Sequence, residues 1–484
     1  MPRYCTVLAA LAVAGLLARA TGGPSLTLLF GGDVMLSRQV AAEIAYRKVS
    51  PWSNLAPMLR GADVAAANFE GAVGTAAECL PVPGRVGSPE PSLCFAVAPA
   101  NIPGLRSAGF AALSVENNHA ADLGGRGRKQ TLQAMQQVGL TALSWNASPI
   151  FVERKGVSLG MVAVSLIPGR DGTSAVLPSP DLARKLRLAR SLSNLVVVFV
   201  HWGTELHDWP SEEQRRDAAW LVAQGADLVI CAHPHVIEAP QCVAGKPVFY
   251  SLGNLLFDQK YPATRTGMLA SCAVGRSRLS CHALLTAPPA GSFFPASAGA
   301  DASADASLAN CQPPLHTTAT LGDAHLFEAD GKNGERSIVG KRGATVLWKT
   351  RPTTLLSLEA APLAGDGSPV LFTLERHASV LDGEDSVRPY VYQLGPGGPV
   401  ARWRGTALAW PLLDARMLPG APGTLCALHR ADSFLVPNPK SRGVRIAAYH
   451  WDGFGFNGLH DAAVLESCRA LLLPEVPAAS QLLP

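Results

Sequence analysis

The chain has 484 residues, of which 48% are hydrophobic and 16% are charged, and its formal net charge is +4 with histidine neutral. A chain of this length and composition can bury a large core and exceeds one ordinary domain, so we expect two globular units. The positive charge is small and spread along the chain, with no run dense in lysine and arginine. This distribution argues against nucleic acid as a partner.

The N-terminus has the pattern of a cleaved export signal. Arg3 supplies a positive start, residues 7–17 are apolar, and residues 18–20 (Ala-Arg-Ala) fit the small-x-small cleavage pattern. We therefore expect a signal peptide over residues 1–20 and a periplasmic or extracellular protein. An uncleaved anchor is the alternative, but the apolar run is shorter than the roughly 20 residues that span a bilayer. No later segment has the pattern of a membrane span.

The cysteine content agrees with export, because disulfides persist in oxidising compartments. The chain has 10 cysteines, and removal of Cys5 with the signal peptide leaves an odd number. At least one cysteine should therefore be free or pair outside the chain. Burial as small apolar residues is the alternative for several of them. Close spacing suggests three pairs: Cys79 with Cys94, Cys272 with Cys281, and Cys426 with Cys468.

Residues 26–285 repeat one alternation: a short apolar run, a polar cluster directly after it, and a longer segment with helical spacing. This pattern is typical of strand, loop and helix units around a buried sheet. Residues 211–214 (Ser-Glu-Glu-Gln) form a capping box before a helix that Gly225 should end, and residues 127–138 predict another helix. The expected strands are 26–30, 63–67, 111–115, 157–166, 195–200, 228–231 and 248–252.

Composition changes after this region. Residues 287–315 are rich in Ala, Ser, Pro and Gly, which predicts a linker or a flexible insertion. We therefore place an α/β domain at residues 21–286 and a β-rich domain at residues 316–484. The strands expected in the second domain are 344–348, 353–358, 370–374, 390–394, 424–428 and 445–451.

The second domain contains a weak internal repeat, in which residues 370–376 are echoed by residues 424–430. Two degenerate copies indicate propeller-like blades or a β-sandwich, and the sequence does not choose between them. Four tryptophans could line a binding surface, although packing in the core is the commoner role of such residues: Trp348, Trp403, Trp410 and Trp451.

Polar side chains follow five successive strands of the first domain. The motifs are Gly-Gly-Asp-Val-Met (31–35), Asn-Phe-Glu (68–70), Asn-Asn-His (117–119) with Asp122, His-Trp-Gly-Thr-Glu (201–205) and His-Pro-His (233–235). Carboxylate, amide and imidazole ligands without thiolate suit Mn, Fe, Zn or Mg, and they suit a two-metal site. Two such ions would orient a water, lower its pKa and stabilise charge on a phosphoryl or carbonyl oxygen. The implied reaction is hydrolysis or group transfer.

Each of these residues also has a structural alternative. Asp33 could cap the following helix, and the paired asparagines could form left-handed turns. Asp122 and Glu205 are expected to orient histidines rather than to ligate, whereas Arg38 could clamp an anionic substrate or pair with an acid. Their joint occurrence favours a metal site, since buried polar groups need partners.

Together with Tyr-Ser-Leu-Gly-Asn (250–254), these motifs resemble the CapA family, bacterial capsule-synthesis proteins associated with poly-γ-glutamate. The resemblance covers residues 26–285. It implies similarity to calcineurin-like metallophosphoesterases, with a four-layered α/β fold and a dinuclear metal site. The metal-ligand candidates that it implies are Asp33, Glu70, Asn118, His201, His233 and His235.

The resemblance also implies roles for the surrounding residues. His119 would be the general acid or a substrate-clamping histidine, and Asp122 and Arg38 complete the expected catalytic set. Ser251 and Asn254 would stand near the rim of the site and shape it. The residues expected to support the ligands from outside are Asn68, Asn117, Glu205 and Asn254.

The sequence departs from the family pattern at three positions. Phe69 replaces the usual Leu of Asn-Leu-Glu, which is a mild change. Glu116 stands where relatives usually have Ala before Asn-Asn-His, and so adds an acid. Ala232 stands where relatives commonly have the first histidine of His-His-Pro-His, so this motif has one histidine fewer.

Three functional hypotheses remain open at the level of sequence. The first is an exported metal-dependent hydrolase or transferase of capsule or envelope-polymer metabolism, acting on an anionic polymer or a phosphoester. The second is a non-catalytic factor that binds polymer or the polymer-synthesis machinery and has a structural or vestigial metal site. The third is a metal-dependent phosphatase or nucleotidase unrelated to capsule. Fold alone does not choose among them.

Overall fold

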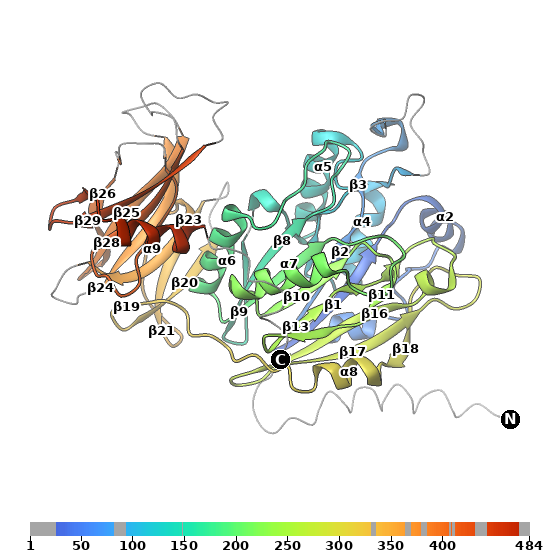
Figure 1. Ribbon diagram of the computed structural model, residues 1–484. Coiled ribbons are helices and arrows are strands. Elements are labelled where there is room, and N and C mark those ends of the chain that lie inside the picture. Colours follow the sequence, from blue (N-terminus) through green and yellow to red (C-terminus); the bar gives the residue numbers. More distant parts are fainter. Residues whose placement is uncertain are drawn as a thin grey trace.

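The computed structural model describes residues 26–81, 93–147, 149–330, 335–363, 369–378, 385–405, 408, 412–430 and 443–473. The expected signal peptide and Trp410 lie outside these residues. The described elements form a mixed α/β domain followed by a β-rich region (Figure 1). Among the described residues, no helix is both long and apolar enough to cross a membrane.

The first sheet of the α/β domain contains the N-terminal strand. Its order is β18-β17-β16-β1-β2-β5-β6, and β15 also pairs with β1. Strands β1, β2, β5 and β6 run parallel, whereas β16, β17 and β18 add to them in antiparallel fashion. The bounds are β1 Leu26–Val34, β2 Val64–Phe69, β5 Ala112–Ser114, β6 Thr141–Leu143, β15 Asn254–Leu256, β16 Gly267–Val274, β17 Leu279–Ala287 and β18 Ala296–Ala300.

The second sheet has the order β12-β13-β10-β9-β8-β7. Its four central strands are parallel and nearly continuous in apolar residues, as expected of strands that are buried on both faces. The bounds are β7 Ile150–Arg154, β8 Val157–Ser165, β9 Leu195–His201, β10 Leu228–Ala232, β12 Gln241–Val243 and β13 Lys246–Phe249.

The two sheets pack face to face, and helices cover their outer faces. Alternation along β1 shows this directly: Leu28 and Phe30 lie in the core between the sheets, whereas Leu29 lies in the outer core. Phe30 meets Phe199 of β9 edge to face, with ring centroids 5.7 Å apart. The first sheet is covered by α2 Arg38–Arg47, α3 Ala56–Gly61, α4 Ile102–Ala108 and α5 Gly124–Gln137, and the second by α6 Pro180–Leu192 and α7 Glu212–Ala223.

The elements expected in this domain are present. Six of the seven predicted strands form as single strands, and the seventh, 248–252, is divided between β13 and β14 Ser251–Leu252. Strand β1 extends to Val34, so that Asp33 belongs to the strand rather than to the loop after it. The capping box also forms, with the Ser211 hydroxyl accepting from the backbone N–H of Gln214. The helix predicted at residues 127–138 begins three residues earlier, at Gly124.

The segment at residues 287–315 is not a linker. Its residues Ala296–Ala300 form β18 at the edge of the first sheet, and α8 (Ala302–Leu308) packs on β17. A disulfide joins Cys311 to Cys242 in β12. The composition of this segment, rich in small residues, predicted flexibility. Strand pairing and a disulfide between residues 69 positions apart fix it in place instead.

The three cysteine pairs predicted from spacing are confirmed: Cys79–Cys94, Cys272–Cys281 and Cys426–Cys468. The fourth pair, Cys242–Cys311, joins residues that are too far apart in sequence for spacing to suggest it. Cys231 in β10 is free and buried, which agrees with the odd count expected after loss of Cys5.

The β-rich region contains two antiparallel sheets, of which one includes β19 Thr320–Leu321, β20 Ala324–Asp330, β21 Arg336–Arg342 and β22 Thr345–Lys349. The two segments of the repeat become β24 (Pro369–Ala378) and β28 (Thr424–Arg430), which are both inner strands of the larger sheet.

Trp348 and Trp451 are buried, and Trp403 packs against Trp451, so these three tryptophans belong to the core. The larger sheet includes β23 Thr354–Pro362, β24 Pro369–Ala378, β25 Asp385–Gly395, β26 Gly398–Arg404, β27 Leu412–Met417, β28 Thr424–Arg430, β29 Val444–Trp451 and β30 Phe456–Leu459, with α9 Ala462–Leu472 packed on it.

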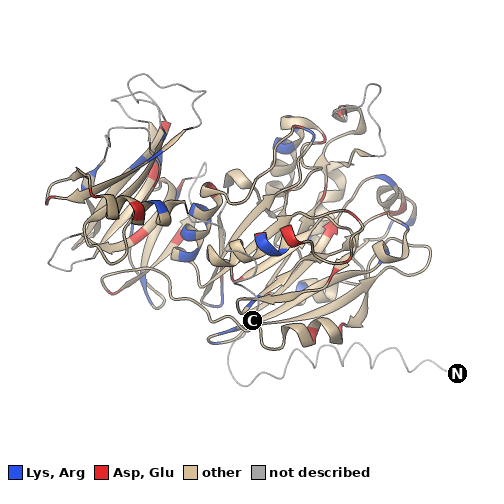
Figure 2. Ribbon diagram, in the orientation of Figure 1, with Lys and Arg blue, Asp and Glu red and all other residues tan. Residues whose placement is uncertain are grey.

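Helix α6 joins the two parts of the chain. Leu188 and Leu192 pack in one core with residues of β19 to β24. On the same helix, Arg187 forms an ion pair of 2.6 Å with Asp414, and the Ser191 hydroxyl donates to the carbonyl of Leu358. Figure 2 shows basic and acidic residues interspersed along the elements of both parts rather than gathered by sign.

Candidate metal centre

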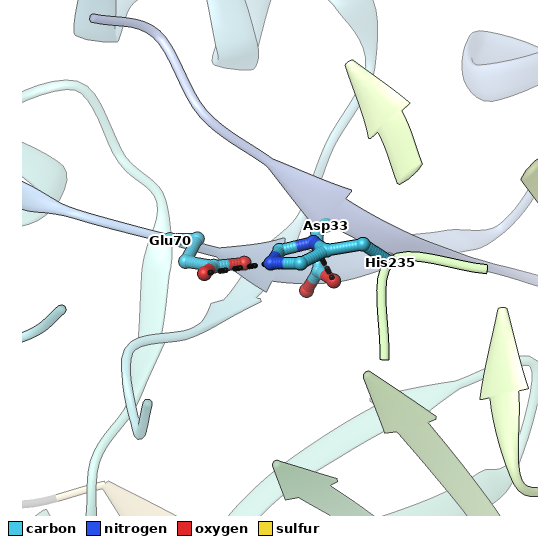
Figure 3. A group of neighbouring side chains, drawn as sticks. All are labelled: Asp33, Glu70 and His235. Carbon is cyan, nitrogen blue, oxygen red and sulfur yellow. Dashed lines mark ion pairs between the residues drawn. The ribbon is translucent and has the colours of Figure 1, made fainter. Parts of the chain in front are cut away.

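Three acidic and imidazole side chains converge where strands of both sheets end. Asp33 lies near the end of β1, Glu70 follows β2, and His235 lies in the loop after β10 (Figure 3). One ligand atom from each of the three lies within 4.8 Å of the other two. His235 Nδ1 is 3.3 Å from Asp33 Oδ2, and its Nε2 is 3.7 Å from Glu70 Oε1. All three side chains are buried.

The backbone around the cluster is closely packed and locally strained. A Cβ atom at Gly32 would lie 1.9 Å from the carbonyl oxygen of Gly253, so only glycine fits directly before Asp33. His233 and His235 have positive φ angles of 106° and 60°. Such angles are unfavourable for residues other than glycine and are concentrated at functional sites.

Asp33 and His235 form a buried ion pair. Burial raises the pKa of Asp33, but the hydrogen bond and the charge of His235 outweigh it and hold the pKa well below its usual range. Burial lowers the pKa of His235, whereas its contact with Asp33 produces a net increase. The Nδ1 atom of His235 also lies 2.9 Å from Asn254 Oδ1. Because Nδ1 faces two acceptors, Nε2 is the atom directed at Glu70.

Glu70 is the observation that points to a cation. It is 0% exposed, and neither of its carboxylate oxygens has a hydrogen-bond partner within the described chain. Burial first and the charge of Asp33 second raise its pKa well above the usual value. Two ionised carboxylates here would face a single imidazolium, His235, so one buried negative charge would stay uncompensated unless a further cation binds. Oxygen and imidazole ligands in this arrangement fit a divalent ion.

A second group of candidate ligands lies beside the first. His201 Nε2 is 2.8 Å from Asn118 Oδ1, and the rings of His201 and His233 are 4.8 Å apart. Burial lowers the pKa of His201 well below its usual value and that of His233 to about 4, so both are neutral imidazoles at pH 7. The 2.8 Å contact between His201 Nε2 and Asn118 Oδ1 is a hydrogen bond that holds the two side chains together, and both atoms are of a kind that divalent ions bind.

Asn68 connects the two groups. Its side-chain amide donates to Asp33 Oδ1 at 2.8 Å and lies 3.4 Å from His201 Nδ1. The neighbouring Asn117 donates to Asn68 Oδ1 and to the carbonyl of Phe69. The structure therefore brings all six predicted ligands into one region, with Asp33, Glu70 and His235 in the tightest group.

His119 lies at the more accessible side of the cluster, with 14% of its side chain exposed. Its Nδ1 is 2.9 Å from Asp122 Oδ2, and its Nε2 is 3.8 Å from Glu70 Oε1. Phe95 stacks on the imidazole with ring centroids 3.6 Å apart. Asp122 therefore orients a histidine, and the free ring nitrogen faces the cluster.

The other predicted residues have different surroundings. Arg38 pairs with Asp258 and lies over the ring of Phe95, 4.5 Å from its centroid. Glu205 is exposed and hydrogen-bonds to no histidine of the described chain. Ser251 and Asn254 are both buried, so neither stands at a rim: Ser251 donates to the carbonyl of Val236, and Asn254 contacts His235.

The structural alternatives for two motifs do not apply. The helix after β1 begins at Arg38 with Ser37 as its flanking residue, so Asp33 does not cap it. Asn117 and Asn118 do not have positive φ angles, and their side chains bind other residues of the cluster instead of forming left-handed turns.

Sequence reasoning missed Arg170, which supports the His119 side. Its Nε donates to Asp122 Oδ1 at 2.8 Å, and its terminal nitrogens donate to the carbonyls of Leu80 and Leu93. These two carbonyls adjoin the Cys79–Cys94 disulfide. Arg170 lies in a turn that no strand-end motif marks, so only the three-dimensional structure identifies it.

The fold and the cluster define an α/β protein with a buried site of metal-ligand type. Residues 27–259 match the family described as bacterial capsule synthesis protein PGA_cap. The matched region of the chain thus belongs to the CapA family of capsule-synthesis proteins, as the motifs predicted.

Curated relatives carry the same association in their names. The chain is 27% identical over 269 residues to the capsule biosynthesis protein CapA of Bacillus anthracis, which covers 50% of this chain and 62% of that protein. It is 28% identical over 259 residues to the PGA biosynthesis protein CapA of Bacillus subtilis strain 168, with 50% and 66% covered. A probable polyglutamine synthesis accessory protein of Mycobacterium tuberculosis is 22% identical over 196 residues, with 34% and 50% covered. The chain thus spans less than two thirds of each relative.

A solved structure of a hypothetical protein from Thermus thermophilus aligns with 57% of this chain and 100% of that chain, at 18% identity and a TM-score of 0.31. A likeness at this level carries no argument about function.

Proposed function

We propose that this protein is an exported metal-dependent hydrolase or transferase that acts in capsule or poly-glutamate biosynthesis. The observation that carries the metal part is Glu70. Neither of its two buried oxygens has a hydrogen-bond donor among the described residues, and the equally buried Asp33 lies beside it. The capsule part rests on the family and on the names of the relatives. An anionic polymer or a phosphoester is the substrate class, and the envelope polymer-synthesis machinery is the proposed partner.

The layer order supports a metallophosphoesterase-type domain. Two sheets pack against each other with helices outside, and the polar cluster lies at the carboxyl ends of β1, β2, β9 and β10. Ligand sites in α/β proteins gather at this edge of parallel strands. On this proposal, Asn118, His201 and His233 hold a second divalent ion beside the one at Asp33, Glu70 and His235.

A divalent ion at this site would lower the pKa of a bound water and polarise a phosphoryl or carbonyl oxygen. The protein's own residues then orient the substrate and move the proton. His119 holds a proton at Nε2 for the leaving group, and Asp122 keeps the ring oriented through Nδ1. Arg38 lies close by, with its charge balanced by Asp258 in this structure.

Ala232 favours a second candidate, a non-catalytic assembly factor that retains a metal. It lies at the end of β10, buried and in register with His201, where it offers no ligand. A site with one ligand fewer would bind one of two ions less tightly. The two candidates differ in turnover and agree on metal content.

The test combines metal analysis with activity. The purified mature chain should contain about one to two divalent ions per molecule and cleave poly-γ-glutamate or a member of a phosphoester panel. Asp33→Asn should reduce both metal content and turnover, whereas Asp217→Asn, a carboxylate of α7 outside the cluster, should change neither. Metal without turnover on any substrate would favour the assembly factor. A protein that binds no divalent ion would refute the proposed site.

A further inference from the structure

A cavity of about 460 Å³ adjoins the metal cluster. Its walls include Glu116 just after β5, Ser165 at the end of β8, Arg128 of α5, and Trp145. This volume lies within the range of pockets that hold small ligands, roughly 300–1,000 Å³. The cavity therefore has the size and the position of a ligand subsite, at the strand ends where such sites occur.

The cavity and the metal cluster share a wall. Gly71, which follows Glu70, and Asn117, which precedes Asn118, both line the cavity. The Asn117 amide donates to the carbonyl of Phe69 at 2.7 Å and so fixes one of these segments to the other. A ligand in the cavity would lie one residue away from two candidate metal ligands.

Glu116 supplies a negative charge to this wall. Its Oε1 accepts from the backbone N–H of Trp145 at 2.8 Å, and it forms no ion pair with any cation of the described chain. Lys185 lies near, but its ammonium is 3.1 Å from Asp181 and sits over the ring of Trp145. Lys185 is therefore paired with Asp181, and its charge, like that of Arg128, acts on Glu116 only from a distance.

Arg128 supplies a positive charge to the same cavity. Its guanidinium lies 3.3 Å from Asp171 and 3.0 Å from the Thr173 hydroxyl, and 30% of the side chain is exposed. The lining thus holds Arg128, which is paired with Asp171 but remains partly exposed, and Glu116, which has no ion pair within the described residues. This combination is complementary to a group that carries an ammonium and a carboxylate. Serine and asparagine side chains complete the polar lining: Ser144, Asn146, Ser165 and Ser174.

We propose that this cavity binds the amino-terminal unit of a peptide-type polymer, with Glu116 contacting the ammonium group and Arg128 contacting the carboxylate. The inference rests on the proposed function, from which it takes the polymer class. An internal unit of a γ-glutamyl chain carries a carboxylate but no ammonium, whereas the amino-terminal unit carries both. A phosphoester without an ammonium group offers no cation to Glu116 and would be disfavoured in this cavity. Binding of the amino-terminal unit in the cavity would place the end of the polymer chain, rather than an internal unit, next to the metal site.

The test measures binding by calorimetric titration of the full mature chain with two peptides, γ-glutamylglutamate and its N-acetyl derivative. The first has the ammonium group and the second does not. Wild-type protein should bind the free-amine peptide about tenfold to a hundredfold more tightly, the range for a hydrogen bond to a charged group. This comparison requires no variant and so does not depend on how a substitution folds.

Glu116→Gln tests the residue itself. Glutamine keeps an oxygen to accept from Trp145 N–H and removes only the charge. The variant should lose most of the preference for the free amine and leave the weak binding of the acetylated peptide unchanged. Glu213→Gln is the matched control, because the Glu213 side chain is 77% exposed on α7, and it should bind as wild type does.

Three results would overturn the inference: equal binding of the two peptides by wild type, no binding of either at millimolar concentration, or an unchanged preference in Glu116→Gln. Repeating the titration after chelation separates it from the proposed function. Glu116-dependent peptide binding in a protein without metal-dependent turnover would refute the enzyme and support the cavity. Metal-dependent turnover without any effect of Glu116 would refute the cavity alone.

Discussion

Glu70→Gln should change the stability of this protein in opposite directions with and without metal. In the metal-free protein, the Glu70 carboxyl is buried next to Asp33 with no donor, and its pKa is raised by burial and by that charge. Glutamine cannot ionise, so it avoids the cost of burying this acid, and it offers an amide N–H to Asp33. Relief of one unsatisfied buried group is worth about 2 kcal/mol, or roughly 4–8 °C in the midpoint of a domain of this size.

In the presence of metal the order should reverse. A divalent ion at 100 times its dissociation constant stabilises the wild-type protein by about 2.7 kcal/mol. Glu70→Gln weakens that ion and should gain little from it. Metal-loaded wild type should therefore melt above the variant, and chelated wild type should melt below it.

Thermal unfolding by calorimetry, after chelation and after readdition of Mn²⁺ or Zn²⁺, measures both differences. Asp227→Asn is the control, because Asp227 is equally buried but paired with Lys246 and His316. It should destabilise the protein to the same extent with and without metal. If Glu70→Gln lowers the melting temperature of the chelated protein, or if metal stabilises the variant as much as the wild type, the assignment of Glu70 is wrong.

Three further predictions concern catalysis and pH. His119→Ala should lower kcat by about 10²–10⁴ with metal content unchanged, as turnover and metal analysis would show; unchanged kcat would remove His119 from the mechanism. Arg170→Gln should lower kcat about tenfold with little change in KM, because Asp122 loses its guanidinium partner, and partial rescue by Arg170→Lys would separate positioning from folding. Burial raises the pKa of Glu238 to about 7 in the folded protein. Between about pH 4.5 and 7 the unfolded chain has released this proton whereas the folded protein keeps it, so the free energy of unfolding falls as pH rises. Glu238→Gln should then be more stable at pH 8 by up to about 3 kcal/mol and equal to wild type at pH 4 in denaturant titrations; a constant difference would contradict the shift.

The sequence predicted the α/β domain well because its signals are local. Continuous apolar runs mark β1, β8, β9 and β10, and a capping box marks the start of α7. The ligand candidates followed from the same signals, since each polar motif comes directly after a strand. Parallel strands bring such motifs to one edge whatever their distance along the chain.

Pairings within the site could not be predicted in this way. Nothing local in the sequence distinguishes Asp33 beside His235 from Asp33 beside His201. In the structure, His235 Nδ1 lies 3.3 Å from Asp33, whereas the Asn68 amide contacts both Asp33 and His201. Arg170 was missed because its partner Asp122 lies 48 residues away. The supposed linker was misread because strand pairing and the Cys242–Cys311 disulfide, which are both long-range, fix residues with little local preference.

The position of the cluster on β1 explains how the fold tolerates it. Asp33 and Glu70 place two carboxylates side by side in the interior, which opposes folding before any ion binds. Strand β1 pairs with β2, β15 and β16, and its apolar residues contribute to both cores of the first sheet. Strand β1, which pairs with three other strands, thus holds one of the two buried carboxylates, and Glu70 follows its neighbour β2. Because this support comes from the cores and not from the cluster, substitutions of the ligands should remove metal while leaving the domain folded.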